Sequence, residues 1–274
     1  MKASRLVLLL PLVVKGWAAD SAVVGPPKGS LILVGGGRLG SQILERFIDL
    51  AGGRDSVFVI IPTADADHPA GPENSFLVRA GCKDVTVLHT LDRDVADSEE
   101  FVKPLQRARG VWFTGGHKWR LVDSYLHTRT EQELYAVLER GGVIGGGSAG
   151  ASIQGSYLVR GAREGPEVMM APGYEQGFGF LRGVAIDQHL LARHRENDML
   201  QVIDKHPELL GIGIDEGTAI VVEGDRFEVI GNSKVAIYDP RHAPEPDGPR
   251  YYFLKPGDRF DLRTRRASST TAAP

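Results

Sequence analysis

Short apolar runs alternate with amphipathic segments through the first half of the chain. The runs have the length of buried strands and occupy residues 30–34, 56–61, 85–88, 110–113 and 143–145. Apolar side chains recur at helical spacing over residues 41–51, with Ser41 near the start, and again over residues 130–140. This alternation predicts a parallel sheet that is covered by helices on both faces.

The pattern changes toward the end of the chain. Residues 212–214, a turn at 215–217 and residues 218–222 predict a hairpin-like pair of strands. Further strand-like runs occupy residues 226–230, 234–238 and 251–254. We expect all of them to be antiparallel additions to one α/β domain over residues 28–265, followed by a disordered tail at 266–274 that is rich in Ser, Thr and Ala.

Ligand chemistry in parallel sheets gathers at the carboxyl ends of the strands. The loops expected there are residues 35–37, 62–65, 114–118 and 146–150. The first loop begins a G-x-G-x-x-G pattern at Gly35, Gly37 and Gly40, but no acidic residue ends the second strand as a dinucleotide site would require. We therefore interpret it as a turn that packs a helix against a strand, and no cofactor is predicted.

Composition restricts the class of partner. The 274 residues are 42% hydrophobic and 24% charged, with a formal net charge of -3. These values are ordinary for a soluble globular protein and give no reason to expect a nucleic-acid partner. The single cysteine, Cys82, excludes an intrachain disulfide.

The start of the chain has the order of a secretory signal. Lys2 and Arg5 precede an apolar run at residues 6–14, and small residues follow. This predicts a signal segment over residues 1–19 and a secreted protein, with a plain N-terminal extension as the alternative. The apolar run is too short to span a bilayer, so the mature form is expected to have no membrane attachment.

The most informative stretch is GGVIGGGSAGAS at residues 141–152. It contains G-x-S-x-G, which places a serine on a tight turn between a strand and a helix, with its hydroxyl exposed. Ser148 is then a candidate nucleophile, and the amide of Ala149 would face an oxyanion that forms on the attacked carbonyl. A phosphate cradle and a plain packing turn are the alternatives.

A serine nucleophile requires a base, and the base requires an orienting acid. His189 ends the triplet Asp-Gln-His, directly after an apolar strand at 184–186, although an ordinary loop histidine has the same appearance. Glu216 and its neighbour Asp215 follow another strand, where a simple turn is the alternative. Two further acids compete for this role, Glu164 and Glu167.

Five motifs occur together and in order, and as a set they resemble the cyanophycinase family of serine peptidases, relatives of the aspartyl dipeptidases of the dipeptidase E type. The motifs are FTGGHK at 113–118, GGGSAGAS at 145–152, IDQHLLARHREN at 186–197, GIGIDEGTAIVVEG at 211–224 and LKPGDRFDLRTR at 254–265. The resemblance implies a flavodoxin-like α/β fold similar to class I glutamine amidotransferases. It also implies that Ser148 is the nucleophile, His189 the general base and acid, and Glu216 the orienting carboxylate.

The resemblance extends to the oxyanion hole and the substrate. The Ala149 amide would act with the amide of Gly115 or Gly116. Family members cleave cyanophycin, a poly-aspartate backbone that carries arginine on its side-chain carboxyls, and release β-Asp-Arg dipeptides. The implied partner is therefore a peptide or a cyanophycin-like polymer. Because relatives of this fold often form pairs, the resemblance also implies a homodimer.

Substrate contacts are implied at four positions, Asp187, Gln188, Arg193 and Arg195. A solvated, charged start of a helix is the alternative for the two arginines. The chain departs from the family at His117 and Lys118, where an Asp or Asn followed by Gln is usual. Two basic residues there would repel an arginine side chain or favour additional carboxylates, and no second ligand at suitable spacing supports a metal site at His117.

The sequence thus leaves three hypotheses. The first is a secreted serine peptidase that cleaves aspartate-rich peptides or cyanophycin through an acyl-enzyme. The second is an aspartyl dipeptidase that acts on short peptides. The third is a catalytically silent protein that binds an acidic ligand.

Overall fold

The computed structural model describes residues 23–268, apart from 68–70, 72, 74 and 243–247. The predicted signal segment at 1–19 lies outside the described residues. So do residues 269–274 of the predicted tail. Both predictions therefore stay predictions.

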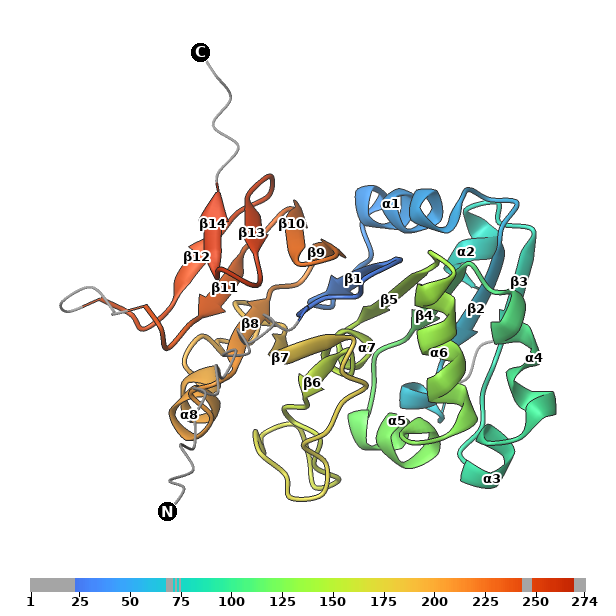
Figure 1. Cartoon of the computed structure of the whole chain (residues 1–274), viewed down its shortest axis with the longest axis horizontal. Coiled ribbons are helices and arrows are strands. Elements are labelled where there is room, and N and C mark those ends of the chain that lie inside the picture. The colour runs from blue at the N-terminus through green and yellow to red at the C-terminus, as the bar shows by residue number, and fades with distance from the viewer. Residues whose placement is uncertain (1–22, 68–70, 72, 74, 243–247, 269–274) are drawn as a thin grey trace, which may run out of the picture.

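The larger sheet has nine strands. Its parallel part follows the order β1-β5-β4-β2-β3, with bounds Ser30–Val34, Val143–Gly147, Gly110–Phe113, Val57–Ile61 and Asp84–Val87. The antiparallel strands β9, β10, β13 and β14 extend it beyond β1, with bounds Thr218–Glu223, Arg226–Gly231, Arg259–Asp261 and Arg266–Ser268. The predicted α/β class, with a parallel sheet and added antiparallel strands, is confirmed (Figure 1).

A second sheet of five strands was not predicted. Its order is β12-β11-β8-β7-β6, with bounds Tyr252–Leu254, Val235–Tyr238, Leu210–Ile214, Leu181–Gln188 and Gly155–Tyr157. The strands β6, β7 and β8 run parallel, whereas β11 and β12 pair antiparallel. Some of the late strands therefore build a separate layer and do not extend the first sheet.

The predicted hairpin over residues 212–222 is wrong. β8 belongs to the smaller sheet and β9 to the larger one, so the turn between them carries the chain from one sheet to the other. The Asp215 carboxylate accepts hydrogen bonds from the amides of Leu191 and Ala192, both at 2.9 Å. The Gly217 amide donates to the Gly36 carbonyl at 3.0 Å. These contacts to other loops, rather than a hairpin ladder, determine the course of the turn.

Helices cover both faces of the larger sheet. The helical elements are α1 (Ser41–Ala51), η1 (Thr63–Asp65), α2 (Phe76–Arg79), α3 (Arg93–Ala96), α4 (Glu99–Arg107), α5 (Lys118–Tyr125), α6 (Arg129–Glu139), α7 (Ala149–Ser152) and α8 (Asp198–Lys205). The helices predicted at 41–51 and 130–140 correspond to α1 and α6. Within the described ranges, no helix combines the length and the apolar character needed to traverse a bilayer.

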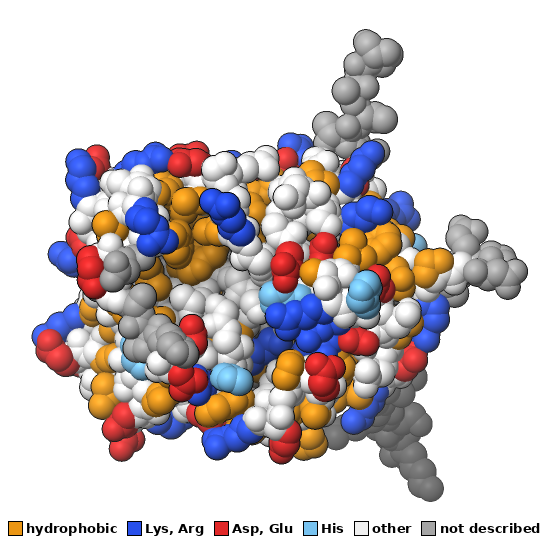
Figure 2. All heavy atoms as spheres, turned by 180° about the vertical axis from the view of Figure 1, so that it is seen from behind, with side chains coloured by type: hydrophobic (Ala, Val, Ile, Leu, Met, Phe, Trp, Pro, Cys, Tyr) orange, Lys and Arg blue, Asp and Glu red, His pale blue; other side chains and the backbone are white. Residues whose placement is uncertain are grey.

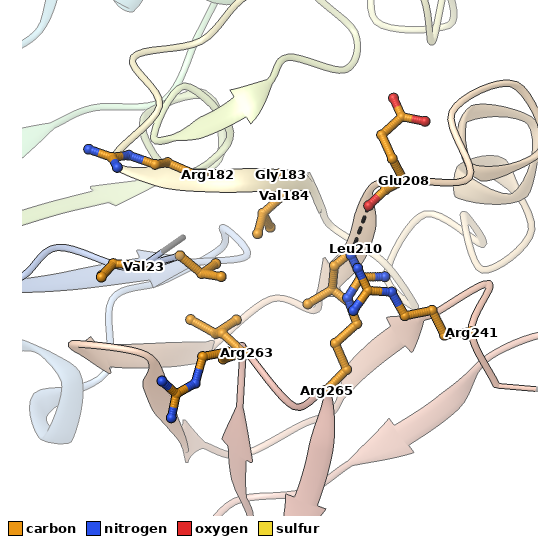
Figure 3. Close-up of a pocket in the computed structure, with 11 residues that line it drawn as sticks. Val23, Arg182, Gly183, Val184, Glu208, Leu210, Arg241, Arg263 and Arg265 are labelled. Atoms are coloured by element: carbon orange, nitrogen blue, oxygen red, sulfur yellow. Dashed lines mark hydrogen bonds between the residues drawn. The ribbon is translucent and has the colours of Figure 1, made fainter. Parts of the chain in front are cut away.

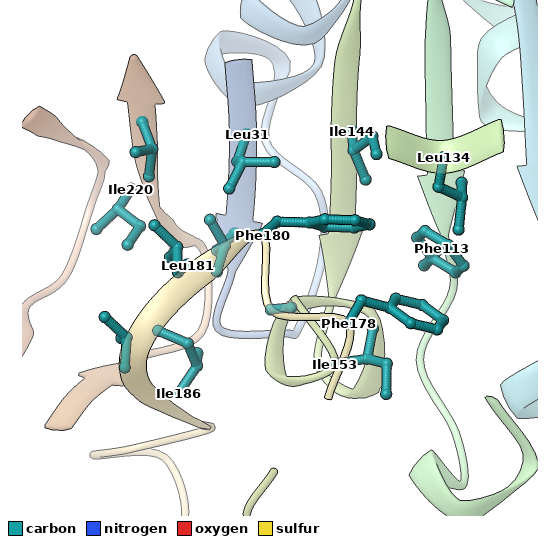
Figure 4. Packing of buried hydrophobic residues seen from close by; sticks show 14 of the residues in the cluster. Leu31, Phe113, Leu134, Ile144, Ile153, Phe178, Phe180, Leu181, Ile186 and Ile220 are labelled. Carbon is teal, nitrogen blue, oxygen red and sulfur yellow. The ribbon is translucent and has the colours of Figure 1, made fainter. Parts of the chain in front are cut away.

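The alternation of side chains along β1 separates two cores. Ile32 and Val34 pack with α1 and α2, whereas Leu31 and Leu33 face the side of α4, α6 and the smaller sheet. On that second side, Phe113 at the end of β4 packs against Phe178, with ring centroids 5.6 Å apart (Figure 4). Aromatic packing thus joins the segment before β7 to the parallel strands.

The start of the predicted disordered tail is wrong by three residues. Arg266–Ser268 form β14, which pairs antiparallel with β13. The turn before β14 is anchored by Arg265, whose guanidinium donates to the buried Asp239 carboxylate at 2.7 Å and to the carbonyls of Glu208 and Leu209. A buried ion pair therefore orders a segment whose composition alone indicates disorder.

We expect Phe113→Ala to lower the free energy of unfolding by about 3–5 kcal/mol, because it removes a fully buried ring and leaves a cavity. Phe253→Ala, which truncates a ring that is 38% exposed, is the matched control and should cost clearly less. Urea unfolding followed by circular dichroism measures both. Equal losses in the two variants would contradict the packing described above.

Candidate active site

Ser148 lies on the predicted tight turn between β5 and α7. Its backbone has φ 54° and ψ -112°, values that are unfavourable for a residue with a side chain. The turn is also crowded, because a Cβ on Gly146 would overlap the Gly150 carbonyl and a Cβ on Gly150 would overlap the Phe113 carbonyl. The glycines of G-x-S-x-G are therefore required by close backbone packing, and the turn presents the serine at the carboxyl edge of the sheet.

Three side chains that are distant in sequence form one chain of hydrogen bonds. Ser148 Oγ lies 2.9 Å from His189 Nε2, and His189 Nδ1 lies 2.6 Å from Glu216 Oε1. When the Nδ1 hydrogen is donated to the carboxylate, Nε2 is the acceptor for the serine hydroxyl. The structure thus brings together the three residues that the sequence proposes as nucleophile, base and orienting acid.

The environment of His189 keeps its imidazole neutral near pH 7. The side chain is only 9% exposed, and this burial is the main cause that lowers its pKa below 6.5. Arg193 and Arg195 lower the pKa further by repulsion, while the hydrogen bond to Glu216 opposes them. A neutral imidazole is the form that can accept a proton from a hydroxyl.

The glycine loop after β1 supports this chain of hydrogen bonds, which sequence reasoning missed. Gly36 has φ 120°, and a Cβ there would overlap the His189 ring. A Cβ on Gly37 would lie 2.8 Å from a carboxylate oxygen of Glu216. The sequence predicts a packing turn here, and the loop does pack, but against His189 and Glu216. Its place among the four loops at the carboxyl edge was the signal that could have revealed this role.

Asp215 positions the segments that carry His189 and Glu216, and it does not touch Ser148. Its carboxylate holds the amides that follow His189, as described above, and accepts a hydrogen bond from the Ser233 hydroxyl at 2.6 Å. Burial acts to raise its pKa, but these hydrogen bonds outweigh burial and lower it. The competing acids lie elsewhere, since Glu164 is exposed and Glu167 lies 4.0 Å from Arg195.

The backbone groups proposed for an oxyanion hole lie beside the serine. Ala149 is the first residue of α7, and first-turn amides of a helix have no intrahelical acceptor. Gly115 is close enough that a Cβ on it would lie 3.8 Å from Ser148 Oγ. Gly116, with φ 131°, packs against the Ala64 carbonyl and lines the same cavity as Ser148.

A cavity of about 240 Å³ opens beside Ser148 and His189. Its wall includes Gly116, His117, Lys118, Arg160, Ala162, Pro166, Gln188 and Arg193. Basic side chains and histidines also border a hollow on the face shown in Figure 2. Four of the six residues proposed as substrate contacts, His117, Lys118, Gln188 and Arg193, therefore line the cavity.

The other two proposed contacts, Asp187 and Arg195, do not line the cavity. Asp187 is fully buried and accepts hydrogen bonds from Arg160 Nε at 2.9 Å and Nη2 at 3.1 Å. Arg195 is 4% exposed and donates to the Gln188 carbonyl at 3.4 Å. Arg160 was missed because it lies in an irregular segment without a motif, yet its guanidinium, held by Asp187 and Asp198, forms part of the wall.

A larger cavity of about 360 Å³ lies elsewhere in the fold (Figure 3). Several arginines surround it, Arg182, Arg241, Arg263 and Arg265. None of Ser148, His189 and Glu216 lines this cavity, so volume alone does not identify the reactive site. In the part of the chain that the structure describes, no group of three or more His, Cys, Asp and Glu residues is arranged to hold a metal ion.

Comparison with known proteins points to one family. Residues 31–230 match the family model of peptidase family S51. The cyanophycinase of Geminocystis herdmanii (strain PCC 6308) is 30% identical over 260 residues, covering 87% of this chain and 96% of that protein. The cyanophycinase of Synechococcus elongatus is 31% identical over 269 residues, covering 90% of this chain and 83% of that protein.

Two solved structures have a similar fold. A peptidase from an acI-B1 Actinobacterium matches with a TM-score of 0.65 at 24% identity, covering 87% of this chain and 98% of that one. A putative peptidase E protein from Listeria monocytogenes EGD-e matches with a TM-score of 0.51 at 17% identity, covering 75% of this chain and 100% of that one. These likenesses support the flavodoxin-like fold.

We expect Gly36→Ala to displace the His189 ring, because the added methyl group occupies the position of the imidazole. The reactivity of Ser148 toward a fluorophosphonate should then fall by about tenfold or more, since the serine loses its hydrogen-bonded base. Gly40→Ala is the control, because a Cβ there meets no atom within 4 Å. Equal labelling rates in the two variants would show that the loop does not support the imidazole.

Proposed function

This chain belongs to peptidase family S51, and from that premise we propose that it cleaves aspartate-rich peptides or cyanophycin through a covalent acyl-enzyme. That it is a peptidase of the cyanophycinase type follows from the family and its relatives. The observation that carries the proposed mechanism is the unbroken chain of hydrogen bonds from Ser148 through His189 to Glu216.

In the proposed acylation, the serine hydroxyl is the nucleophile. Ser148 Oγ attacks the peptide carbonyl carbon while its proton passes to His189 Nε2. Glu216 stabilises the imidazolium that forms, and the amides of Ala149 and Gly115 or Gly116 stabilise the negative charge on the carbonyl oxygen. As the tetrahedral intermediate collapses, the C–N bond breaks and His189 returns the proton to the departing amine.

Deacylation repeats the same steps with water as the nucleophile. His189 accepts a proton from the water as its oxygen attacks the ester carbonyl. The ester C–O bond then breaks, and the proton returns to Ser148 Oγ. The cycle releases a carboxylic acid and regenerates the serine, so this chemistry asks for no redox step.

An aspartyl dipeptidase is the second candidate. The observation in its favour is the size of the cavity, about 240 Å³, which suits a few residues better than a long chain. The basic side chains of the cavity wall suit acidic peptides in either case. The third hypothesis, a catalytically silent binding protein, is set aside, because the chain belongs to a peptidase family and such a protein would not require the 2.9 Å contact between Ser148 and His189.

We also propose that the protein acts outside the cell. The support is the order of basic, apolar and small residues at the start of the chain, over residues 1–19. Expression in a secretion-competent host, followed by N-terminal sequencing of protein from the medium, tests this. Retention of residues 1–19 on protein that stays inside the cell would contradict it.

We expect native protein to react with a fluorophosphonate at Ser148, and Ser148→Ala to abolish both labelling and peptide hydrolysis. Glu216→Gln should lower kcat by about 10²–10⁴, because the neutral amide no longer holds the imidazole in its reactive tautomer. Mass spectrometry of labelled protein and initial rates on an aspartate-rich peptide are the measurements. Full hydrolysis by Ser148→Ala would eliminate the mechanism.

Two substrates separate the peptidase candidates. Insoluble cyanophycin and the dipeptide Asp-Leu are incubated with equal amounts of protein, and released amines are quantified. Release from the polymer supports the cyanophycinase assignment, whereas turnover of the dipeptide alone would favour the aspartyl dipeptidase. Ser148→Ala is the matched control in both assays.

The pH dependence of kcat/KM should follow the protonation of His189. Its pKa is lowered below 6.5, mainly by burial, so the neutral and active imidazole persists below the usual range and is lost as the pH falls through the lowered value. An acidic limb below 6.5 is expected. An acidic limb centred above 6.5 would contradict the assigned base.

A further inference from the structure

Lys118 is a buried cation without a partner. Its side chain begins α5 and is part of the cavity wall beside Ser148, yet the residue is only 4% exposed. Among the described residues, no hydrogen bond or ion pair involves its ammonium group. Lysine is rarely buried unless it is paired, because an ammonium group loses its hydration in the interior. The missing partner is therefore expected from outside the chain.

The charges around Lys118 have an excess of cations. Arg160, Arg193 and Arg195 repel the ammonium group, and Asp187 is the opposing carboxylate. Burial in the first place, and this repulsion in the second, lower the pKa of Lys118 to about 7. Other titratable or charged groups of these elements are His117 before α5, Arg120, Asp123 and Tyr125 on α5, His189 beside Ser148, and Glu167, which is exposed and lies near Arg195. Of these, Asp123 is paired with Arg163.

The buried carboxylate that acts on Lys118, Asp187, is already used. Asp187 Oδ1 accepts hydrogen bonds from Arg160 Nε and from the Gln188 amide, and Oδ2 accepts from Arg160 Nη2. Its charge is thus committed to Arg160, and the carboxylate does not line the cavity. An arginine side chain that enters the cavity meets cations, whereas a carboxylate meets an unpaired ammonium group and the exposed Arg193.

We propose that Lys118, together with Arg193, forms a subsite that binds a free side-chain carboxylate of the substrate, so that this peptidase prefers unsubstituted poly-aspartate to its arginine-bearing form. The inference rests on the proposed function, because the subsite shares its cavity with Ser148. The bound carboxylate supplies the counter-charge that the protein lacks there.

Pairing with a carboxylate makes binding depend on pH. The anion stabilises the protonated ammonium, so the pKa of Lys118 rises above its free value of about 7 when the substrate binds. Above pH 7 the free protein must take up a proton to bind, and KM for the acidic peptide should rise by up to about tenfold per pH unit. Loss of the Lys118 proton therefore raises KM at alkaline pH. Protonation of His189 instead lowers kcat/KM at acidic pH.

The test compares tetra-aspartate with the same tetrapeptide carrying arginine on its β-carboxyls. We expect a lower KM for tetra-aspartate in the native chain and an increase of about 10- to 100-fold in Lys118→Met, the range typical of a lost charged hydrogen bond. Lys118→Arg should retain binding without the alkaline rise in KM. Lys118→Gln should shift the preference toward the arginine-bearing peptide.

Lys103→Met is the matched control, because Lys103 is an exposed lysine on α4 that should leave both KM values unchanged. Thermal unfolding of each variant shows whether it is folded, and Lys118→Gln serves if Lys118→Met is not. An unchanged ratio of the two KM values in folded Lys118 variants would overturn the proposal. So would a lower KM of the native chain for the arginine-bearing peptide.

Failure of the subsite and failure of the peptidase are distinguished by calorimetry. Tetra-aspartate is titrated into Ser148→Ala and into Ser148→Ala with Lys118→Met, so binding is measured without hydrolysis. Weaker binding in the second protein supports the subsite even if the native chain cleaves neither peptide, a result that would refute only the peptidase. Equal binding refutes the subsite even if fluorophosphonate labels Ser148 and both peptides are cleaved.

Discussion

The 2.9 Å contact between Ser148 and His189 is the constraint on which the site depends, because the two residues reach it from different sheets. His189 and Glu216 follow β7 and β8, which are neighbouring parallel strands of the smaller sheet. Ser148, at the end of β5, belongs to the larger sheet alone. The three side chains meet only if the two sheets dock in one register, so the large apolar core between them is a requirement of the chemistry as well as of stability.

Backbone contacts transmit that docking to the side chains. The His189 amide donates to the Gly35 carbonyl at 2.9 Å, and the Gly217 amide donates to Gly36. The loop after β1 therefore holds both His189 and the turn that carries Glu216. Ser148 and His189 both have positive φ values, 54° and 57°, which cost free energy that the surrounding packing must offset. Such strain is tolerable in an interior where glycines allow backbones to approach closely.

Charge is distributed differently at the two ends of the cavity. Around the serine, burial and the nearby arginines outweigh Glu216 and favour a neutral imidazole that can accept a proton. Around Lys118, the guanidinium groups of Arg160, Arg193 and Arg195 leave an excess of positive charge. The first arrangement supports a reaction that relatives of this chain share. The second surrounds the proposed carboxylate subsite, and so chemistry and substrate choice depend on different residues of one pocket.

Local signals in the sequence were sufficient for the parallel sheet, for α1 and α6, and for the turn that presents Ser148, because periodicity and glycine spacing are short-range features. The order of motifs was sufficient for the family and for the residues proposed as triad and oxyanion hole. Four features came only from the tertiary structure. They are the second sheet, the crossover at 215–217, the strand β14 in the expected tail, and the support of the site by Gly36 and Gly37. Each depends on which distant segments become neighbours: Asp215 reads as a turn residue until the amides of Leu191 and Ala192 are placed against it. The same holds for Lys118, whose burial and lack of a counter-charge are properties of the folded wall and not of the residues beside it in the chain.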